Sequence, residues 1–476
     1  MQCTVNSATL RGIDSIPFEI HITQTGSFPS FDVVGLPEHS ARESRVRIRS
    51  AIRESGFEMP NKRIVVQMAG DNHKEGPATD LAVAIGLLSI NGHLPGVDLS
   101  KLLILGELSL SGELLPVRGA FCHALEARKA GRTVICATGN AAEAWGGNPS
   151  VITGRSLSEV VNNLRHTLFY RGVYGDASPT RLGWMPCWSD IRGQGRAKRA
   201  LEVAVAGGFP VLLVGPPGCG KTMLARRVPS ILPPLHHRDA IEVTQIASAA
   251  GLLPRGVSVL DSRPFRAPHH TGSTVSLVGG GTMIRPGEVS LAHNGVLYLD
   301  ELPKFSSASI AAVSDALHDG ASTIMRRGQS TGFPADPFLV AAANPCPCGF
   351  SSSILHDCSD SDAAKKQYQA RTNKAASKLG IKLRVELQPQ TPRELKHEPV
   401  GETSEEVRER VTRSQDLQLK RYGNLVCKTG MPLLDALAVV IATLDGRAVP
   451  DSNDDSLAAE LFGLENNNQD AVEGRR

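Results

Sequence analysis

The sequence predicts an α/β protein made of successive globular domains, and three observations support this class. The chain has 476 residues, of which 41% are hydrophobic and 21% charged, which suffices for two to four domains with large buried cores. In both halves of the chain, short apolar runs of strand character alternate with segments of helical period. A segment rich in glycine and proline, residues 169–189, separates the two halves and predicts a linker.

The bulk composition predicts a soluble protein of a reducing compartment, which we take to be the cytoplasm. The net charge of +3 neither requires nor excludes nucleic acid as a partner. No apolar run reaches the roughly 18 residues that span a bilayer, and the first residues lack the basic and apolar regions of a secretory signal, so we expect no membrane association. The nine cysteines are scattered and odd in number, which argues against a disulfide framework.

Residues 1–168 predict an N-terminal α/β domain. Strands are expected at residues 64–68, 102–105 and 133–136, and helices at residues 81–88 and 120–130. The mixture of buried strands and helices indicates a layered structure.

Residues 190–390 predict a second α/β domain, with strands at residues 210–214, 295–299 and 338–342. Residues 391–446 predict a partial helical region, which opens with a helix capped at Thr403 and extending to Arg421. Residues 447–476 are polar and acidic, and we expect them to form a disordered tail.

The strongest motif is a glycine-rich loop that matches G-x-x-x-x-G-K-[ST] at every fixed position. An apolar strand precedes the loop and a helix, residues 223–228, is expected to follow it, as a phosphate-binding loop requires. Its glycines let backbone N–H groups turn toward phosphate, Lys221 would reach the β- and γ-phosphates, and Thr222 would ligate Mg²⁺. The loop therefore predicts binding of ATP and Mg²⁺ by Gly215, Pro216, Pro217, Gly218, Cys219, Gly220, Lys221 and Thr222.

Two further strands end in polar residues that suit the same chemistry. Asp300 and Glu301 follow the strand at residues 295–299, so that Asp300 would hold Mg²⁺ through water and Glu301 would polarise the attacking water. Asn344 follows the strand at residues 338–342 and could align that water, although a simple turn residue before a proline would look the same. These positions predict catalytic roles for Lys221, Glu301 and Asn344.

Two loops carry weaker signals. Cys346, Cys348 and Cys358 could bind Zn²⁺ if a fourth ligand exists, and His356 and Asp360 are the nearest candidates; the alternative is a loop of reduced, unliganded cysteines. Residues 266–271, Arg-Ala-Pro-His-His-Thr, could contact nucleic acid or line a pore. Spacing alone favours a loop whose histidines hydrogen-bond to the backbone.

Long motifs across the second domain closely resemble the YifB/ComM group of bacterial AAA+ proteins, which are related to the ATPase subunit of magnesium chelatase. The resemblance covers roughly residues 1–425. Besides the loop at residues 215–222 it rests on residues 190–194, 197–202, 263–271, 277–281, 285–293, 300–303 and 344–349. It implies a hexameric, ring-shaped homo-oligomer that hydrolyses ATP, and the competence members act on DNA as branch-migration helicases in natural transformation. Branched or single-stranded DNA is thus an implied partner, and Asn344 an implied sensor residue.

The resemblance extends to the N-terminal domain, at residues 34–37, 43–47 and 74–77, and implies a fold similar to the proteolytic domain of Lon. This domain is not expected to be proteolytic. Ala78 follows the Gly76-Pro77 pair where Lon has its serine, and no lysine occurs near His123, where the partner base would fall.

The chain departs from the family at three places on the ATPase side. Where the family has an arginine that can act on a neighbouring subunit's nucleotide, this chain has Gly380, and Arg326, Arg327 or Arg384 would have to substitute. The helical lid after Tyr422, which carries a second sensor arginine in the family, is expected to be largely absent. The family also has two C-x-C pairs where this chain has three cysteines and Asp360.

These features leave three functions open. The first is an ATP-driven DNA motor in recombination or transformation. The second is a nucleotide-binding paralogue or ring subunit with weak or no hydrolysis, which the missing arginine and lid favour. The third and less expected function is a chelatase ATPase subunit, against which the cysteine loop and the N-terminal domain argue.

Overall fold

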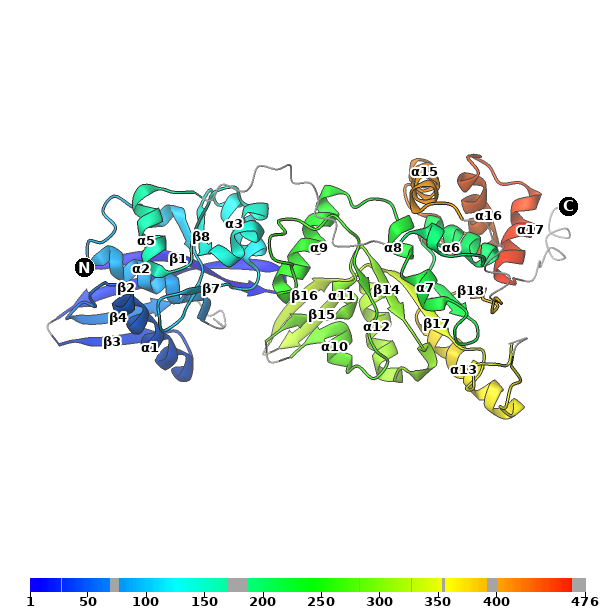
Figure 1. The fold of residues 1–476 in the computed structure, drawn as a ribbon, viewed down its shortest axis with the longest axis horizontal. Coiled ribbons are helices and arrows are strands. Elements are labelled where there is room, and N and C mark those ends of the chain that lie inside the picture. Colours follow the sequence, from blue (N-terminus) through cyan, green and yellow to red (C-terminus); the bar gives the residue numbers. More distant parts are fainter. Residues whose placement is uncertain are drawn as a thin grey trace.

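The computed structural model describes residues 1–26, 28–68, 77–169, 186–281, 283–326, 328–352, 356–391 and 401–464. The N-terminal domain, the P-loop domain and a group of C-terminal helices follow one another along the long axis of the molecule (Figure 1). Within these residues, no helix combines the length and the apolar character needed to cross a membrane.

The N-terminal domain contains a mixed sheet and a parallel sheet that enclose a common apolar core. The mixed sheet has the order β1-β2-β4-β3, in which only the β3–β4 pair is parallel. The parallel sheet has the order β5-β8-β9. The helix α2 (Asp80–Ile90) packs against β1 and β2 and is buried along almost its whole length, as expected of a helix that is apolar on every side.

The remaining elements of this domain connect or cover the sheets. The strands are β1 (Gln2–Arg11), β2 (Asp14–Thr25), β3 (Ser30–Val34), β4 (Arg63–Met68), β5 (Leu102–Ile104), β6 (Glu107–Leu108), β7 (Leu114–Leu115), β8 (Thr133–Ala137) and β9 (Val151–Gly154). The helices besides α2 are α1 (Glu38–Glu54), α3 (Ala120–Lys129), α4 (Ala141–Gly147) and α5 (Leu157–His166). The strands and helices predicted from the sequence are all present, whereas residues 170–185 of the predicted linker lie outside the described residues.

The P-loop domain is built on a five-stranded, entirely parallel sheet. The strand order is β11-β14-β17-β10-β18, so that β17 (Phe338–Ala343) separates β10 (Val211–Val214) from β14 (Val296–Leu299). The inner strands are buried on both faces, as continuous Val/Leu/Ala runs require. The carboxyl ends of β10, β17 and β14 are therefore neighbours at one edge of the sheet.

Helices and hairpins surround this sheet (Figure 1). The helices are α6 (Gly195–Gly207), α7 (Lys221–Ala225), α8 (Val228–Ile231), α9 (His237–Ala250), α10 (Thr274–Val278), α11 (Glu288–Leu291), α12 (Ser307–Asp319) and α13 (Asp362–Lys378). The remaining strands are β11 (Phe265–Arg266), β12 (Gly279–Gly280), β13 (Arg285–Pro286), β15 (Ala321–Arg326), β16 (Gln329–Pro334) and β18 (Leu383–Glu386).

The helix predicted at residues 223–228 is instead divided into α7 and α8. Pro229 lies in the first turn of α8, where its missing N–H costs nothing, whereas a continuous helix would need that donor.

In the described part of the C-terminal region, the helices α15 (Ser404–Tyr422), α16 (Leu433–Leu444) and α17 (Ser452–Phe462) pack against α6. The predicted cap of α15 is confirmed, because Thr403 and Glu406 form a capping box. The expectation that helical structure is largely absent after Tyr422 is wrong: α16 is almost entirely buried in the core of the P-loop domain.

The prediction of a disordered tail from residue 447 is wrong for residues 452–462. Asp451 caps α17, and Asp454 pairs with Arg447 at 2.6 Å, so these acidic residues start a helix instead of solvating a coil. Ala458, Leu461 and Phe462 then bury one face of α17 in the core. Residues 465–476 of the predicted tail lie outside the described residues.

Phe462→Ala is expected to destabilise the C-terminal helices by about 3 kcal/mol, because it removes a side chain that is only 5% exposed. Denaturant titration with protease cleavage of these helices as the readout measures the change. The exposed Ser456 of the same helix supplies the control Ser456→Ala, and equal stability of the two variants would contradict the packing of α17.

Candidate phosphate-binding site

The glycine-rich loop leaves the carboxyl end of β10 and turns directly into α7. Gly218 and Gly220 have φ angles of +79° and +100°, in the left-handed region that favours glycine. A Cβ atom at either position would meet no atom within 4 Å, so the space beside the loop is open. Since the first N–H groups of a helix lack partners within the helix, the loop and the start of α7 present donors to that space.

Lys221 lies across the loop. Its Nζ atom donates to the carbonyl oxygens of Gly215 and Pro216, at 2.7 and 2.9 Å, and to Oδ1 of Asn344 at 3.1 Å. Gln194, which sequence reasoning did not single out, donates from Nε2 to the carbonyl oxygen of Cys219 at 3.2 Å. The lysine is thereby held at the mouth of the loop and linked to the end of β17.

Thr222 and Asp300 meet across two strands. The Oγ1 atom of Thr222 lies 3.3 Å from Oδ2 of Asp300 and 3.2 Å from the hydroxyl of Tyr298. Two oxygens that ligate one octahedral Mg²⁺ at 2.0–2.1 Å are about 2.9 Å apart when adjacent, so this pair needs only a small adjustment to fit Mg²⁺. Tyr298 was not predicted as a site residue; it occupies an apolar strand position, and only its contact with Thr222 reveals it.

Glu301 is held in an unusual backbone conformation beside this pair. Its φ angle is +53°, and its N–H donates to Oδ1 of Asp300 at 2.9 Å. Lys304 Nζ lies 2.5 Å from Oε1, and His270 Nδ1 lies 3.2 Å from Oε2. The hydrogen bond from Lys304 lowers the pKa of the Glu301 carboxyl, so this side chain is ionised at neutral pH.

Spacing alone favours a loop at residues 266–271 whose histidines hydrogen-bond to the backbone. His269 fits this expectation, because it accepts the N–H of Thr271 at 3.4 Å, whereas His270 contacts a side chain. His270 approaches the side chain of Glu301, while Arg266 forms two hydrogen bonds with Glu288, at 2.6 and 2.7 Å. The parallel pairing of β11 with β14 explains this contact, because it brings the loop after β11 beside the residues after β14.

Gly380 follows the C-cap of α13 in the short connection to β18, and β18 is a neighbour of the strand before the glycine-rich loop. It is exposed, with a φ angle of +69°. Of the alternative arginines, Arg384 pairs with Glu386 at 3.3 Å and Arg326 donates to the carbonyl oxygen of Gly281. Arg327 lies outside the described residues.

The three predicted zinc ligands are brought together after β17. The Sγ atoms of Cys346, Cys348 and Cys358 lie 3.4–3.7 Å apart, and Asp360 joins the same cluster.

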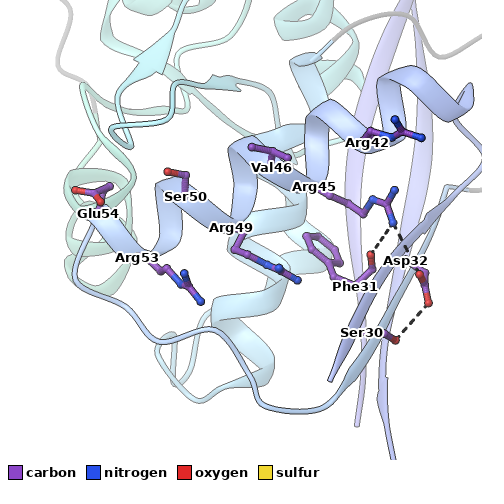
Figure 2. A pocket seen from close by; sticks show the side chains of 10 residues that line it. All are labelled: Ser30, Phe31, Asp32, Arg42, Arg45, Val46, Arg49, Ser50, Arg53 and Glu54. Carbon is purple, nitrogen blue, oxygen red and sulfur yellow. Dashed lines mark hydrogen bonds and ion pairs between the residues drawn. The ribbon is translucent and has the colours of Figure 1, made fainter. Parts of the chain in front are cut away.

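A separate pocket of about 600 Å³ lies in the N-terminal domain between α1 and β3 (Figure 2). Four arginines of α1, at positions 42, 45, 49 and 53, line it together with Asp32 and Glu54. Arg45 is tied to β3, whereas among the described residues neither Arg49 nor Arg53 makes an ion pair. Arginines spaced in this way are common on the solvent-exposed face of an amphipathic helix. Here the guanidinium groups of Arg49 and Arg53 are also available to bind an anion.

The two positions at which the resemblance would place a Lon-type serine and its partner base, Ala78 and His123, both lie among the described residues. Ala78 lies in a short 3-10 helix at Pro77–Thr79, and His123 is buried and hydrogen-bonded to Ser15 at 2.7 Å. Burial lowers the pKa of His123 to about 4, so this histidine is neutral.

The fold and this site define the class of protein: its parallel sheets and mixed α/β structure agree with a P-loop fold of the AAA+ type. Residues 187–395 match the family described as magnesium chelatase, subunit ChlI, and residues 19–140 match the family described as subunit ChlI of Mg-chelatase.

Relatives cover most of the chain. It is 36% identical over 426 residues to the uncharacterized protein YifB of Salmonella typhimurium, spanning 88% of this chain and 83% of that protein. It is 36% identical over 418 residues to the competence protein ComM of Haemophilus influenzae, spanning 86% and 81%. A magnesium-chelatase 67 kDa subunit of Chlorobaculum parvum is 32% identical over 165 residues, which span 34% of this chain and 24% of that subunit. The chain belongs to the YifB/ComM family.

Proposed function

We propose that this chain binds ATP and Mg²⁺ at residues 215–222 and hydrolyses ATP to drive work on DNA. In this proposal it is a cytoplasmic, hexameric motor of the branch-migration type, and its N-terminal domain is Lon-like but not proteolytic. The observation that carries the proposal is the convergence of Lys221, Thr222, Asp300 and Asn344 at the carboxyl ends of three adjacent parallel strands, where open α/β sheets bind their ligands.

Each residue has a distinct task in this proposal. The open glycine loop would receive the phosphates, and Lys221 would exchange its loop carbonyls for phosphate oxygens. Thr222 and Asp300 would hold Mg²⁺, which neutralises phosphate charge when bound. Glu301 would orient the attacking water after its carboxylate leaves Lys304 or His270, and Asn344 would align it. Zn²⁺ would be a structural ion at the cysteine cluster.

The second candidate function is nucleotide binding with slow hydrolysis. Gly380 favours it, because the position at the end of α13 has no guanidinium group to offer a neighbouring subunit. The contacts that hold the Glu301 carboxylate, from Lys304 and His270, point in the same direction. A chelatase subunit is less well supported, since the chelatase relative matches only 34% of this chain.

Steady-state ATP turnover of the purified chain, measured with and without branched DNA and beside a size measurement in ATP, separates these functions. The motor proposal expects DNA to stimulate turnover and ATP to promote a ring. ATP binding without DNA-stimulated turnover would instead establish the second function.

Replacing both Arg49 and Arg53 with alanine is expected to weaken DNA binding through the pocket of Figure 2. If each guanidinium contacts one phosphate, the slope of log K against log salt should fall by about 1–2. Salt titrations of DNA affinity measure this slope. The exposed Arg128 and Lys129 of α3 supply a control double variant of equal charge, and an equal loss in that control would show that only net charge matters.

Tyr298→Phe is expected to weaken Mg²⁺-dependent ATP binding about 2–10-fold, because Thr222 loses one neutral hydrogen bond worth about 0.5–1.5 kcal/mol. ATP affinity measured with Mg²⁺ and with EDTA tests this expectation. Tyr422→Phe, at the end of α15, is the control. An equal loss of affinity with and without Mg²⁺ would show that Tyr298 supports the fold instead of the metal ligand.

A further inference from the structure

The described segments after β17, residues 344–352 and 356–360, bring together three thiols and one carboxylate. Cys346 is buried, and Cys348, Cys358 and Asp360 are half-buried. We propose that these four residues bind one Zn²⁺ ion and that the ion holds these segments against the phosphate-binding loop. The inference extends the proposed function, but the metal content of the protein can be measured independently of nucleotide binding.

The sulfur positions match a tetrahedral metal site. The Sγ–Sγ distances are 3.4 Å for Cys346–Cys348, 3.5 Å for Cys348–Cys358 and 3.7 Å for Cys346–Cys358. A tetrahedron with Zn–S bonds of about 2.3 Å has edges of about 3.8 Å, whereas a disulfide requires about 2.05 Å. The three thiols therefore already stand near the distances that one zinc ion imposes, and none is bonded to another.

Asp360 is the fourth donor that the structure provides. Its Oδ2 atom lies 3.9 Å from Sγ of Cys358 and accepts the N–H of Cys348 at 2.8 Å, which fixes the carboxylate beside the sulfurs. His356, the other candidate from the sequence, stands edge-on to the ring of Phe350 at 5.0 Å and is not part of the cluster. Four protein donors leave no open position, so the ion would be structural and not catalytic.

Backbone groups around the cluster suit thiolate ligands. The N–H of Ser351 donates to Sγ of Cys346 at 3.3 Å. Hydrogen bonds of this kind orient metal ligands, and their loss typically lowers metal affinity roughly 10–100-fold.

The cluster is joined to the phosphate-binding loop at two places. Asn344, two residues before Cys346, accepts from Lys221 Nζ at 3.1 Å. Gly349, with a φ angle of +90°, passes so close to the P-loop that a Cβ atom there would lie 2.6 Å from Cδ of Pro217. On its other side the cluster leads into α13, which Ser361 caps. An ion at this place would fix the end of β17, the start of α13 and the P-loop relative to one another.

Metal content of the full-length chain tests the site. Protein purified under reducing conditions and dialysed against a weak chelator is expected to retain stoichiometric zinc, and Co²⁺ in its place should give the spectrum of tetrahedral thiolate coordination. Cys348→Ser should lose the metal, Asp360→Asn should weaken its binding by at least roughly 10–100-fold, and Asp360→Cys should retain it. Cys3→Ser and Asp357→Asn are the controls outside the cluster. A metal-free wild type, or unchanged zinc in both Cys348→Ser and Asp360→Asn, would overturn the proposal.

Hydrogen exchange tests the bracing role. Removal of zinc should accelerate exchange in residues 217–222 as well as in residues 344–352, while β8 in the N-terminal domain should not change. Zinc that binds without any effect on residues 217–222 would show that the ion does not brace the P-loop. Lys221→Ala should leave the zinc content intact, so failure of nucleotide binding and failure of the metal site are distinguishable.

Discussion

Lys221→Ala is expected to abolish measurable nucleotide binding, with an affinity lower by about 10²–10⁴-fold. The ammonium group lies at the mouth of the loop and would make two charge-assisted hydrogen bonds to phosphate, each worth about 1.5–3 kcal/mol. Calorimetric titration with ATP and Mg²⁺ measures the loss.

Lys101→Ala is the matched control, because Lys101 is an exposed lysine of the N-terminal domain that pairs only weakly with Asp98. Normal ATP binding by the Lys221→Ala variant would show that the phosphate site has been assigned to the wrong loop.

Glu301→Gln is expected to lower ATP turnover by about 10²–10⁴-fold while ATP binding is retained, since the amide cannot accept a proton from the attacking water. The substitution keeps the size of the side chain and leaves Thr222 and Asp300 in place. Single-turnover hydrolysis and ATP binding, measured on the same preparation, separate the two effects.

The control is Glu113→Gln, at an exposed glutamate of the N-terminal domain. If turnover of the wild-type chain is already as slow as that of Glu301→Gln, the glutamate does not act as a base. The slow-hydrolysis function that Gly380 favours would then be correct.

The contacts of Glu301 also give a physical reason why its carboxylate could respond to nucleotide binding. The left-handed backbone conformation of Glu301 is uncommon for a residue other than glycine. Its N–H donates to Asp300, and its carboxylate contacts Lys304 and His270. Nucleotide that displaces Lys304 or His270 from Glu301 would free the carboxylate only when substrate is present. The contact thus offers a way to couple water activation to binding.

The sequence by itself determined the features that depend on local order. The predicted phosphate-binding loop is a continuous run between a strand and a helix, so its residue types and spacing identify it without knowledge of the tertiary structure. The buried strands of the P-loop domain and the capped helix α15 were predicted for the same reason, because apolar period and capping chemistry are local signals. The family resemblance, which rests on long motifs, was confirmed by relatives that cover most of the chain.

Long-range contacts were decided only by the tertiary structure. The order of the strands, with β17 between β10 and β14, brings Asn344 to Lys221 and Tyr298 to Thr222. The spacing of residues along the sequence does not reveal this strand order. Packing likewise favoured Asp360 over His356 in the cysteine cluster. It also turned the acidic segment after residue 447 into a helix, because Ala458, Leu461 and Phe462 find an apolar partner surface there. Composition records how polar a segment is, but whether it folds depends on the free energy of burying its few apolar side chains against the rest of the molecule.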